Sequence, residues 1–163
     1  MKIRPFHPGD EERLTELIAE FRVALGRLRG RTRVADPDQA KGELAEYRSR
    51  EYPIFIAESE DSQVVGYLVC RVDGDVVWAE SLFVSPKHRR KGIGSALYAE
   101  AERLARELGG DTVYNWAHPN NDKIISFLKK RGYTVLNLIE IRRPRAGEGS
   151  RRRIKVGERE FDY

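Results

Sequence analysis

The chain has 163 residues, of which 40% are hydrophobic and 34% charged, and its formal net charge is +4 at pH 7. This length and composition predict one globular domain, residues 1–163, and exclude a disordered chain; the single cysteine excludes an internal disulfide. No apolar run reaches the length of a membrane span and the first residues are not typical of a signal peptide, so we expect a cytoplasmic protein with no membrane partner.

One short strand and two helices are predicted at the start of the chain. Residues 1–5 fit a strand, and Asp10 fits the N-cap of a helix whose apolar residues recur at helical spacing up to Gly30. Asp36 followed by Pro37 is typical of a second helix start, because proline fits the first helical position. This helix is expected to end before the next proline.

The middle of the chain changes to strand patterns. Strands are expected over 54–58, 64–72 and 76–84, and polar turns between them predict an antiparallel meander. The apolar residues of the second strand surround the only cysteine, which favours a buried, inert thiol over a nucleophile. A helix with one apolar face then starts at Ile93 and ends at Gly109.

The remaining pattern predicts a strand over 113–117, a helix over 121–131 and a strand over 133–141. A last strand over 154–161 is expected to pair with its predecessor across a basic loop. The predicted order is β-α-α-β-β-β-α-β-α-β-β, which is a mixed α/β layer fold. An exposed edge on the last strand leaves a homodimer open.

Arginine clusters lie at two places besides the one discussed next. They are Arg27, Arg29, Arg31 and Arg33, and Arg142, Arg143, Arg145 and Arg151 to Arg153. Such clusters are most often solvated surface. A nucleic-acid partner is the alternative, and it is not favoured because few aromatic residues accompany the arginines to stack on bases.

The segment SPKHRRKGIGSAL, residues 85–97, carries five basic side chains directly before Gly92 and Gly94. It joins the end of a strand to the start of a helix, where the first N–H groups have no partner inside the helix and the helix dipole favours negative charge. Glycines let a ligand approach the backbone closely, and Ser95 adds a hydroxyl donor. These features predict a phosphate site, best satisfied by a pyrophosphate.

Two common phosphate motifs do not fit this segment. A P-loop needs four residues between its glycines and then Lys-Ser or Lys-Thr, and both features are missing. A dinucleotide fingerprint needs a small residue where Leu97 stands, and its strand should run straight into the glycines. Here seven residues, 85–91, intervene.

The segment Arg-Arg-Lys-Gly-Ile-Gly, residues 89–94, matches the pattern Arg/Gln-x-x-Gly-x-Gly/Ala and resembles the GNAT superfamily of acetyl-CoA-dependent N-acetyltransferases. The preceding AESLFVSP looks like the fourth strand of that family, and NNDKIISFLKKRGY is similar to its later helix. The similarity is strongest over residues 64–135.

The resemblance implies a mixed, mostly antiparallel sheet of about seven strands with about four helices, splayed between the fourth and fifth strands. It also implies acetyl-CoA as cosubstrate and no metal. The pantetheine arm would lie in the splayed gap like an added strand, and the pyrophosphate at the glycine segment. The implied cofactor contacts are Leu82, Phe83, Val84, Arg89, Arg90, Lys91, Gly92, Ile93, Gly94, Ser95 and Asn121. The alternative role of Asn121 is the N-cap of its helix alone.

Acetyl transfer to an amine needs a proton acceptor and a donor to the thioester oxygen. Glu80 is the candidate base, since it lies beside Trp78 and is expected on one strand face with Leu82 and Val84. The alternative is a carboxylate that simply pairs with an arginine. His118 is the second candidate base, although a structural role is more common for such a histidine. The resemblance implies that the N–H of Val84 is the oxyanion donor.

The chain departs from the family at the general acid. Leu128 stands where the family usually has the tyrosine that protonates the leaving thiolate, and Tyr133 falls at a core aromatic position. Tyr98 and Tyr114 are substitutes for which core packing is the expected role, so the acid stays unassigned. Because the coenzyme A thiol is acidic enough to leave as thiolate, this loss is compatible with activity.

These observations predict an N-acetyltransferase in which a primary amine of a small molecule or a protein attacks acetyl-CoA directly in a ternary complex. The alternative is a protein that binds coenzyme A without catalysis, as the missing tyrosine allows. The basic residues around the first two helices and the last loop favour an acceptor that carries an anionic group.

Overall fold

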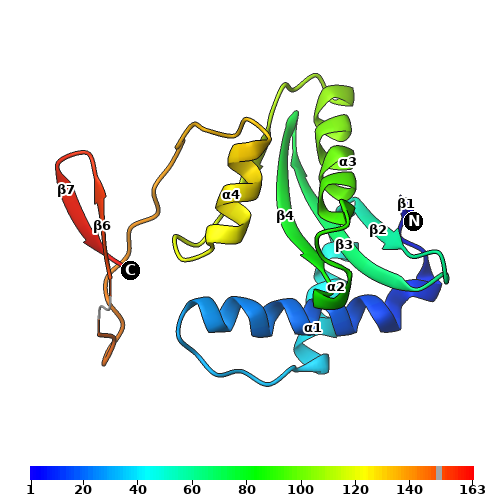
Figure 1. The fold of residues 1–163 in the computed structure, drawn as a ribbon, viewed down its shortest axis with the longest axis horizontal. Helices are drawn as coiled ribbons and strands as arrows, with labels where there is room; N and C mark the ends of the chain where they lie inside the picture. Colours follow the sequence, from blue (N-terminus) through cyan, green and yellow to red (C-terminus); the bar gives the residue numbers. More distant parts are fainter. Residues whose placement is uncertain (150–151) are drawn as a thin grey trace. The chain divides into compact units, whose positions relative to one another are not determined.

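The computed structural model describes residues 1–149 and 152–163, so Ser150 and Arg151 of the predicted basic loop lie outside the described residues. The described residues contain four α-helices and seven strands (Figure 1). They divide into two compact units, Met1–Trp116 and Ala117–Tyr163. The prediction of one domain over 1–163 stays a prediction. No helix among the described residues combines the length and the apolar character that crossing a bilayer requires.

Unit 1, Met1–Trp116, is built on a sheet of five strands in the order β1-β2-β3-β4-β5. The strands are β1 (Lys2–Pro5), β2 (Ile54–Glu58), β3 (Val64–Asp73), β4 (Val76–Val84) and β5 (Val113–Asn115). Neighbouring strands pair antiparallel from β1 to β4, which confirms the predicted meander, and β5 pairs with β4 in parallel.

Two helices, α1 (Glu11–Leu28) and α2 (Pro37–Ser49), pack together and cover one face of this sheet. Asp36 caps α2 as predicted, since its side chain accepts a hydrogen bond from the N–H of Gln39. Asp10 precedes α1, but its carboxylate accepts from the N–H of His7 and from Arg4 rather than from α1. The start of α1 is therefore fixed by an ion pair to β1.

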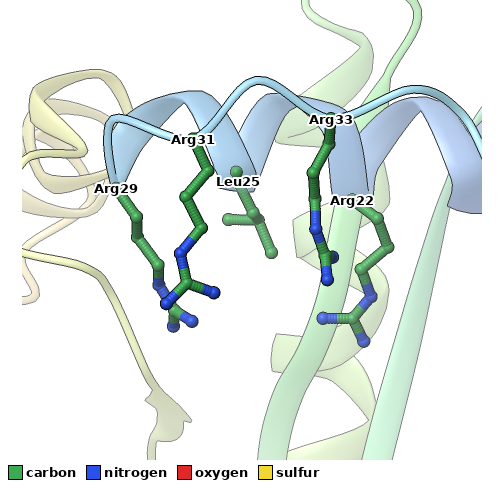
Figure 2. A pocket seen from close by; sticks show the side chains of 6 residues that line it. Arg22, Leu25, Arg29, Arg31 and Arg33 are labelled. Atoms are coloured by element: carbon green, nitrogen blue, oxygen red, sulfur yellow. The ribbon is translucent and has the colours of Figure 1, made fainter. Parts of the chain in front are cut away.

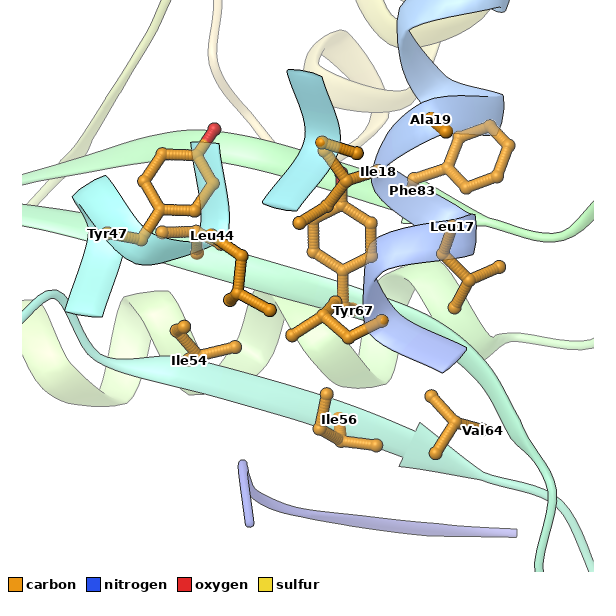
Figure 3. Packing of buried hydrophobic residues seen from close by; sticks show 13 residues of the cluster. Leu17, Ile18, Ala19, Leu44, Tyr47, Ile54, Ile56, Val64, Tyr67 and Phe83 are labelled. Atoms are coloured by element: carbon orange, nitrogen blue, oxygen red, sulfur yellow. The ribbon is translucent and has the colours of Figure 1, made fainter. Parts of the chain in front are cut away.

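The core of unit 1 lies between these helices and the sheet (Figure 3). Leu17 and Ile18 of α1 and Leu44 of α2 are almost fully buried against the sheet residues Tyr67 and Phe83. The Tyr67 hydroxyl lies 2.9 Å from the Ser81 hydroxyl, so this buried polar pair is satisfied within the core. Because Phe83 of β4 packs in this core with residues of α1, the core holds the end of β4 in place.

The third helix, α3 (Ile93–Glu107), contacts β2, β3 and β4, and its inward residues Leu97, Tyr98 and Ala101 are fully buried. Strand residues alternate between faces, so Leu68 and Cys70 lie on the face opposite Tyr67. Burial raises the pKa of the Cys70 thiol to about 12, and the predicted buried cysteine is confirmed.

Unit 2, Ala117–Tyr163, contains α4 (Asp122–Lys130) and a two-stranded sheet of β6 (Arg153–Val156) and β7 (Arg159–Asp162). The strand predicted over 133–141 is wrong, because the structure has no strand there. The single last strand over 154–161 is also wrong: Gly157, at φ +62°, turns the chain, and Val156 pairs with Arg159 in a tight hairpin.

Candidate active site

The sheet opens between β4 and β5. Val77, Trp78 and Ala79 of β4 pair with β5, and the pairing ends there, although β4 continues to Val84. In the described part of the chain, the last residues of β4 thus have a paired strand on the β3 side only. This confirms the predicted splay between the fourth and fifth strands.

The backbone of β4 presents hydrogen-bonding groups to this open edge. The N–H of Ser85 donates to the carbonyl of Val65 at 2.9 Å, so its groups point toward β3. In an antiparallel pair, alternate residues direct their N–H and C=O to opposite edges. Val84, opposite Gly66, and Leu82, opposite Leu68, therefore direct theirs away from β3. The open edge offers the two amides that an extended ligand needs.

A bulge interrupts β4 at Glu80. Val69 pairs with Ser81 and Cys70 pairs with Ala79, so Glu80 has no partner in the register. The extra residue shifts the alternation of faces by one. The simple alternation predicted to put Glu80, Leu82 and Val84 on one face is therefore interrupted, and the Glu80 carboxylate approaches Arg71 of β3.

Glu80 lies next to Arg71, which contacts a group of aromatic residues. Its Oε2 is 4.0 Å from Nε of Arg71, and both side chains are 26% exposed. The guanidinium of Arg71 contacts both Trp78 and Trp116, at 4.8 Å from each ring centroid. No described group accepts a hydrogen bond from this buried Nε. Glu80 thus combines the two predicted situations, an aromatic neighbour and an arginine partner.

Arg71 and Trp116 were not predicted from the sequence as site residues. A signal for Arg71 exists: the two-residue loop Gly74–Asp75 places Asp73 opposite Val76 and so sets Arg71 opposite Trp78. The contact of Trp116 with Trp78, 5.0 Å between ring centroids, depends on how β5 pairs with β4 and has no such local signal.

The turn between β4 and α3 is built from unusual backbone angles. Arg90 has φ +65° and Gly92 has φ +79°, and α3 then begins at Ile93. Glycine adopts this conformation without strain, whereas an arginine in it is uncommon. The segment therefore reverses direction within a few residues and points the start of α3 toward the end of β4.

The first turn of α3 is open to a ligand. Its first helical bond runs from Ala96 N–H to the Gly92 carbonyl at 3.0 Å. The N–H groups of Ile93, Gly94 and Ser95 have no acceptor among the described residues. A Cβ on Gly94 would meet only Cγ2 of Val84, at 4.0 Å. Gly94 therefore leaves space next to the open edge of β4, which fits a ligand spanning both.

The basic side chains of this turn surround the same place. Arg89 folds back on β4: its Nε donates to the carbonyl of Val84 at 2.8 Å, and its guanidinium lies 5.2 Å from the centroid of the Phe83 ring. Arg90 and Lys91 are exposed, and no described carboxylate pairs with either. The helix terminus, the free amides and these cations together form an anion site, and the residues fit a pyrophosphate-bearing ligand.

Three predicted residues belong to unit 2. The Asn121 side chain accepts a hydrogen bond from the N–H of Ile124 at 3.3 Å and so caps α4, whereas its predicted contact with the cofactor stays a prediction. Nδ1 of His118 accepts from the N–H of Asn120 at 3.1 Å, a local structural bond. Leu128 is buried.

The two tyrosines considered as general acids have structural contacts. Tyr98 is fully buried, and its hydroxyl donates to Oδ1 of Asn115 at 2.9 Å. The ring of Tyr114 lies 5.0 Å from that of Trp78, measured between centroids. Both contacts agree with the core-packing role expected for these residues.

Comparison with known proteins gives a consistent result. The profile of the acetyltransferase (GNAT) family matches residues 15–133. Mycothiol acetyltransferase of Mycolicibacterium smegmatis is 34% identical over 109 residues, which cover 66% of this chain and 34% of that protein. Spermidine N(1)-acetyltransferase of Thermoplasma acidophilum is 26% identical over 82 residues, which cover 50% of this chain and 51% of that protein. The chain thus matches about a third and about half of the lengths of these relatives.

Solved structures share the fold. The crystal structure of a probable acetyltransferase superposes with a TM-score of 0.71 at 17% identity, covering 91% of this chain and 100% of that one. The structure of AAC(6')-Iy, in complex with the bisubstrate analogue CoA-S-monomethyl-acetylneamine, gives a TM-score of 0.66 at 19% identity, covering 88% of this chain and 97% of that one. The family profile covers most of the chain and includes the α3 turn and the open edge of β4, and the chain belongs to the GNAT family of acetyltransferases.

Proposed function

We propose that the protein is an N-acetyltransferase that moves an acetyl group from acetyl-CoA to a primary amine of a small molecule or a protein. The observation that carries this proposal is the meeting of the open edge of β4 with the first turn of α3, where Gly94 leaves space next to Val84. An extended chain ending in a pyrophosphate is complementary to both parts.

In this proposal, the N–H and carbonyl of Leu82 and the carbonyl of Val84 hold the pantetheine arm as an added strand, and the N–H of Val84 is left for the thioester oxygen. The N–H groups of Ile93 to Ser95 hold the pyrophosphate, with Arg89, Arg90 and Lys91 supplying charge. The Val84 carbonyl is held by Arg89 in the structure, so this guanidinium releases it when the arm pairs. A contact from Asn121 rests on the resemblance alone.

Acetyl-CoA supplies a thioester, and direct attack forms the C–N bond as the C–S bond breaks and coenzyme A leaves as a thiolate. Glu80 accepts the proton that the attacking amine loses, directly or through a water molecule. The N–H of Val84 donates to the thioester oxygen as it gains charge. No general acid is assigned, because the thiolate is a stable leaving group near neutral pH.

The acceptor is taken to be a small-molecule or protein amine. The names of two relatives, a mycothiol and a spermidine acetyltransferase, support the small-molecule case. The alternative function is coenzyme A binding without catalysis.

The test combines binding and transfer. Thermal unfolding is measured with acetyl-CoA, NAD and ATP, and coenzyme A release is followed across a broad panel of amines with product masses. We expect a melting rise specific to acetyl-CoA and acetylation of at least one amine. A melting rise without transfer to any amine would establish the non-catalytic alternative, and no rise would refute the proposal altogether.

A further inference from the structure

A second group of basic residues surrounds a small pocket at the C-terminal end of α1 (Figure 2). The pocket has a volume of about 80 Å³ and is lined by Arg22, Leu25, Gly26, Arg29, Arg31 and Arg33. One water needs only about 10–15 Å³ on this measure, so the pocket holds a group of several atoms. In Figure 2 the four arginine side chains extend to the same side of the helix.

The chain reversal after α1 brings these arginines together. Gly30 has φ +67°, and the N–H groups of Gly30 and Arg31 donate to the carbonyls of Arg27 and Gly26 at 3.0 and 2.9 Å. This is a Schellman ending, which turns the chain back along its own helix. The residues after Gly30 therefore lie beside the last turns of α1 instead of extending into solvent.

Gly26 leaves room for the returning chain to pack against α1. A Cβ at this position would lie 3.0 Å from Cδ and 3.2 Å from Cγ of Arg33, so the stem of Arg33 rests on the bare helix backbone. Gly26 is itself buried although it lies near the helix end. Glycine lowers helix stability by about 1 kcal/mol relative to alanine, and here it allows a close contact of the arginine stem.

The charges in this pocket are not balanced. Arg22 pairs with Glu43, with Nη2 of the arginine 2.6 Å from Oε1. No described carboxylate lies within ion-pair distance of Arg29, Arg31 or Arg33, although the other arginines of α1, α2 and β1 are mostly paired. Arg29, Arg31 and Arg33 are exposed, so water screens much of their mutual repulsion, and an anion bound among them would relieve the remainder.

One lining residue of the pocket, Arg22, is connected to the end of β4 through aromatic contacts. The guanidinium of Arg22 lies 5.8 Å from the centroid of the Phe21 ring, and the Phe21 ring lies 5.8 Å from that of Phe83, which precedes Val84. From Phe21 to Arg29 the helix rises about 12 Å, at about 1.5 Å per residue. A molecule with an amine near Val84 could therefore reach the pocket with its other end.

We propose that this arginine pocket binds the anionic group, a phosphate or a carboxylate, of the acceptor whose amine is acetylated. The proposal rests on the proposed function, whose acceptor class it names. Guanidinium groups bind both anions through paired N–H donors. The pocket selects for acceptors that are cationic at the amine end and anionic at the other end.

The first test measures acetyl transfer to ω-aminoalkyl phosphates and carboxylates of increasing length, each compared with the alkylamine of equal length. We expect kcat/KM to favour the anionic member of the best pair by about tenfold or more, since charge-assisted hydrogen bonds of this kind are worth one to two tenfold steps. The double variant Arg29→Gln/Arg31→Gln should reduce this preference to about threefold or less. Arg27→Gln is the matched control, because Arg27 is an exposed arginine of the same helix end that does not line the pocket.

Equal rates for anionic and neutral amines would overturn the proposal, as would an equal loss of preference in Arg27→Gln. A second readout separates its failure from that of the proposed function. With coenzyme A at saturation, inorganic phosphate should raise the melting temperature of the wild type and of Arg27→Gln but not of the double variant. If no amine is acetylated, this phosphate effect still decides whether the pocket binds anions. A rise in melting temperature that the double variant lacks would support the anion site, and no rise in the wild type would refute it.

Discussion

Unit 1 has two positively charged regions at opposite ends of two helices, and they are built by different means. The α3 site uses the helix N-terminus, with amide groups of Ile93 to Ser95 that have no acceptor among the described residues. The α1 pocket lies at a helix C-terminus, where the dipole disfavours an anion and the carbonyls of Gly26 and Arg27 are already bonded. Backbone N–H groups form the first site. The second site depends on guanidinium side chains, whose positive charge must outweigh the unfavourable helix dipole.

This difference predicts which substitutions are severe. In the α3 site a single atom in the wrong place blocks the ligand, because the backbone itself makes the contacts. In the α1 pocket several flexible side chains bind the same anionic group. Each substitution there should therefore have a smaller effect, and it should change the preference for acceptors and not the affinity for the cofactor.

The largest effect is expected for Gly94→Leu. A Cβ at this position would meet only Cγ2 of Val84, at 4.0 Å, so the fold should persist, and the rest of the leucine side chain should fill the space between α3 and β4. We expect the affinity for acetyl-CoA to fall by about 100-fold or more, since several charge-assisted hydrogen bonds are lost together. Calorimetric titration measures this.

Asp38→Leu is the matched control, because Asp38 holds the same second helical position in α2 and is exposed. It should bind acetyl-CoA as the wild type does. Normal affinity in Gly94→Leu would show that the ligand does not occupy the first turn of α3.

The next effect concerns the chemistry beside the α3 site. Glu80→Gln should lower kcat by about 100-fold, the lower range for a general base, and leave acetyl-CoA affinity unchanged. Steady-state kinetics and titration separate the two quantities. An unchanged kcat would leave Glu80 with only its structural role beside Arg71.

A paired arginine gives a reference for the unpaired ones of the α1 pocket. Arg4 donates to both carboxylate oxygens of Asp10, at 2.7 and 2.8 Å, and this guanidinium holds the pKa of Asp10 below its usual value. A lowered pKa stabilises the fold above the unfolded-state value of about 3.9, and the gain is lost as pH falls through the folded-state value. Asp10→Asn should cost about 2 kcal/mol at pH 7.

Chemical denaturation at several pH values checks this. The variant should lose less stability than the wild type between pH 5 and the acid limit, because the titrating carboxylate is gone. Glu60→Gln, which changes a carboxylate that is 93% exposed, is the control and should follow the wild type. An identical acid dependence in Asp10→Asn and the wild type would contradict the account of the ion pair.

The smallest effect is expected for Gly30→Ala. Alanine at φ +67° is strained, so unfolding should become easier by about 1 kcal/mol. The Schellman ending should loosen, and the preference for anionic acceptors should weaken although every arginine is retained. A preference equal to that of the wild type would show that the charge of the pocket matters and its geometry does not.

The contrast between the two regions also explains what the sequence could reveal. The α3 site depends on glycines and a helix start at fixed spacing, so the segment from Arg89 to Gly94 predicts it. The α1 pocket depends on Gly26 and Gly30 turning the chain back on itself, and a run of arginines alone is typical of solvated surface. The bulge at Glu80 has no local signal, because its neighbours are ordinary strand residues.

The C-terminal part shows a different limit. The alternating residues of 133–141 fit a strand, but a strand also needs a partner, and sequence pattern does not supply one. The hairpin was predictable: Gly157 followed by Glu158 is a common two-residue loop, and it divides the predicted strand into β6 and β7.

The central claim, that acetyl-CoA lies along the open edge of β4 and ends at α3, is tested most directly by amide hydrogen exchange followed by NMR, with and without acetyl-CoA. Ser85 N–H is bonded to Val65 and should be protected in both states. The amides of Leu82, Val84 and Gly94 should exchange quickly in the free protein and become protected on binding. Protection at all three would establish the account. Unchanged exchange at Leu82 and Val84 with bound acetyl-CoA would contradict it.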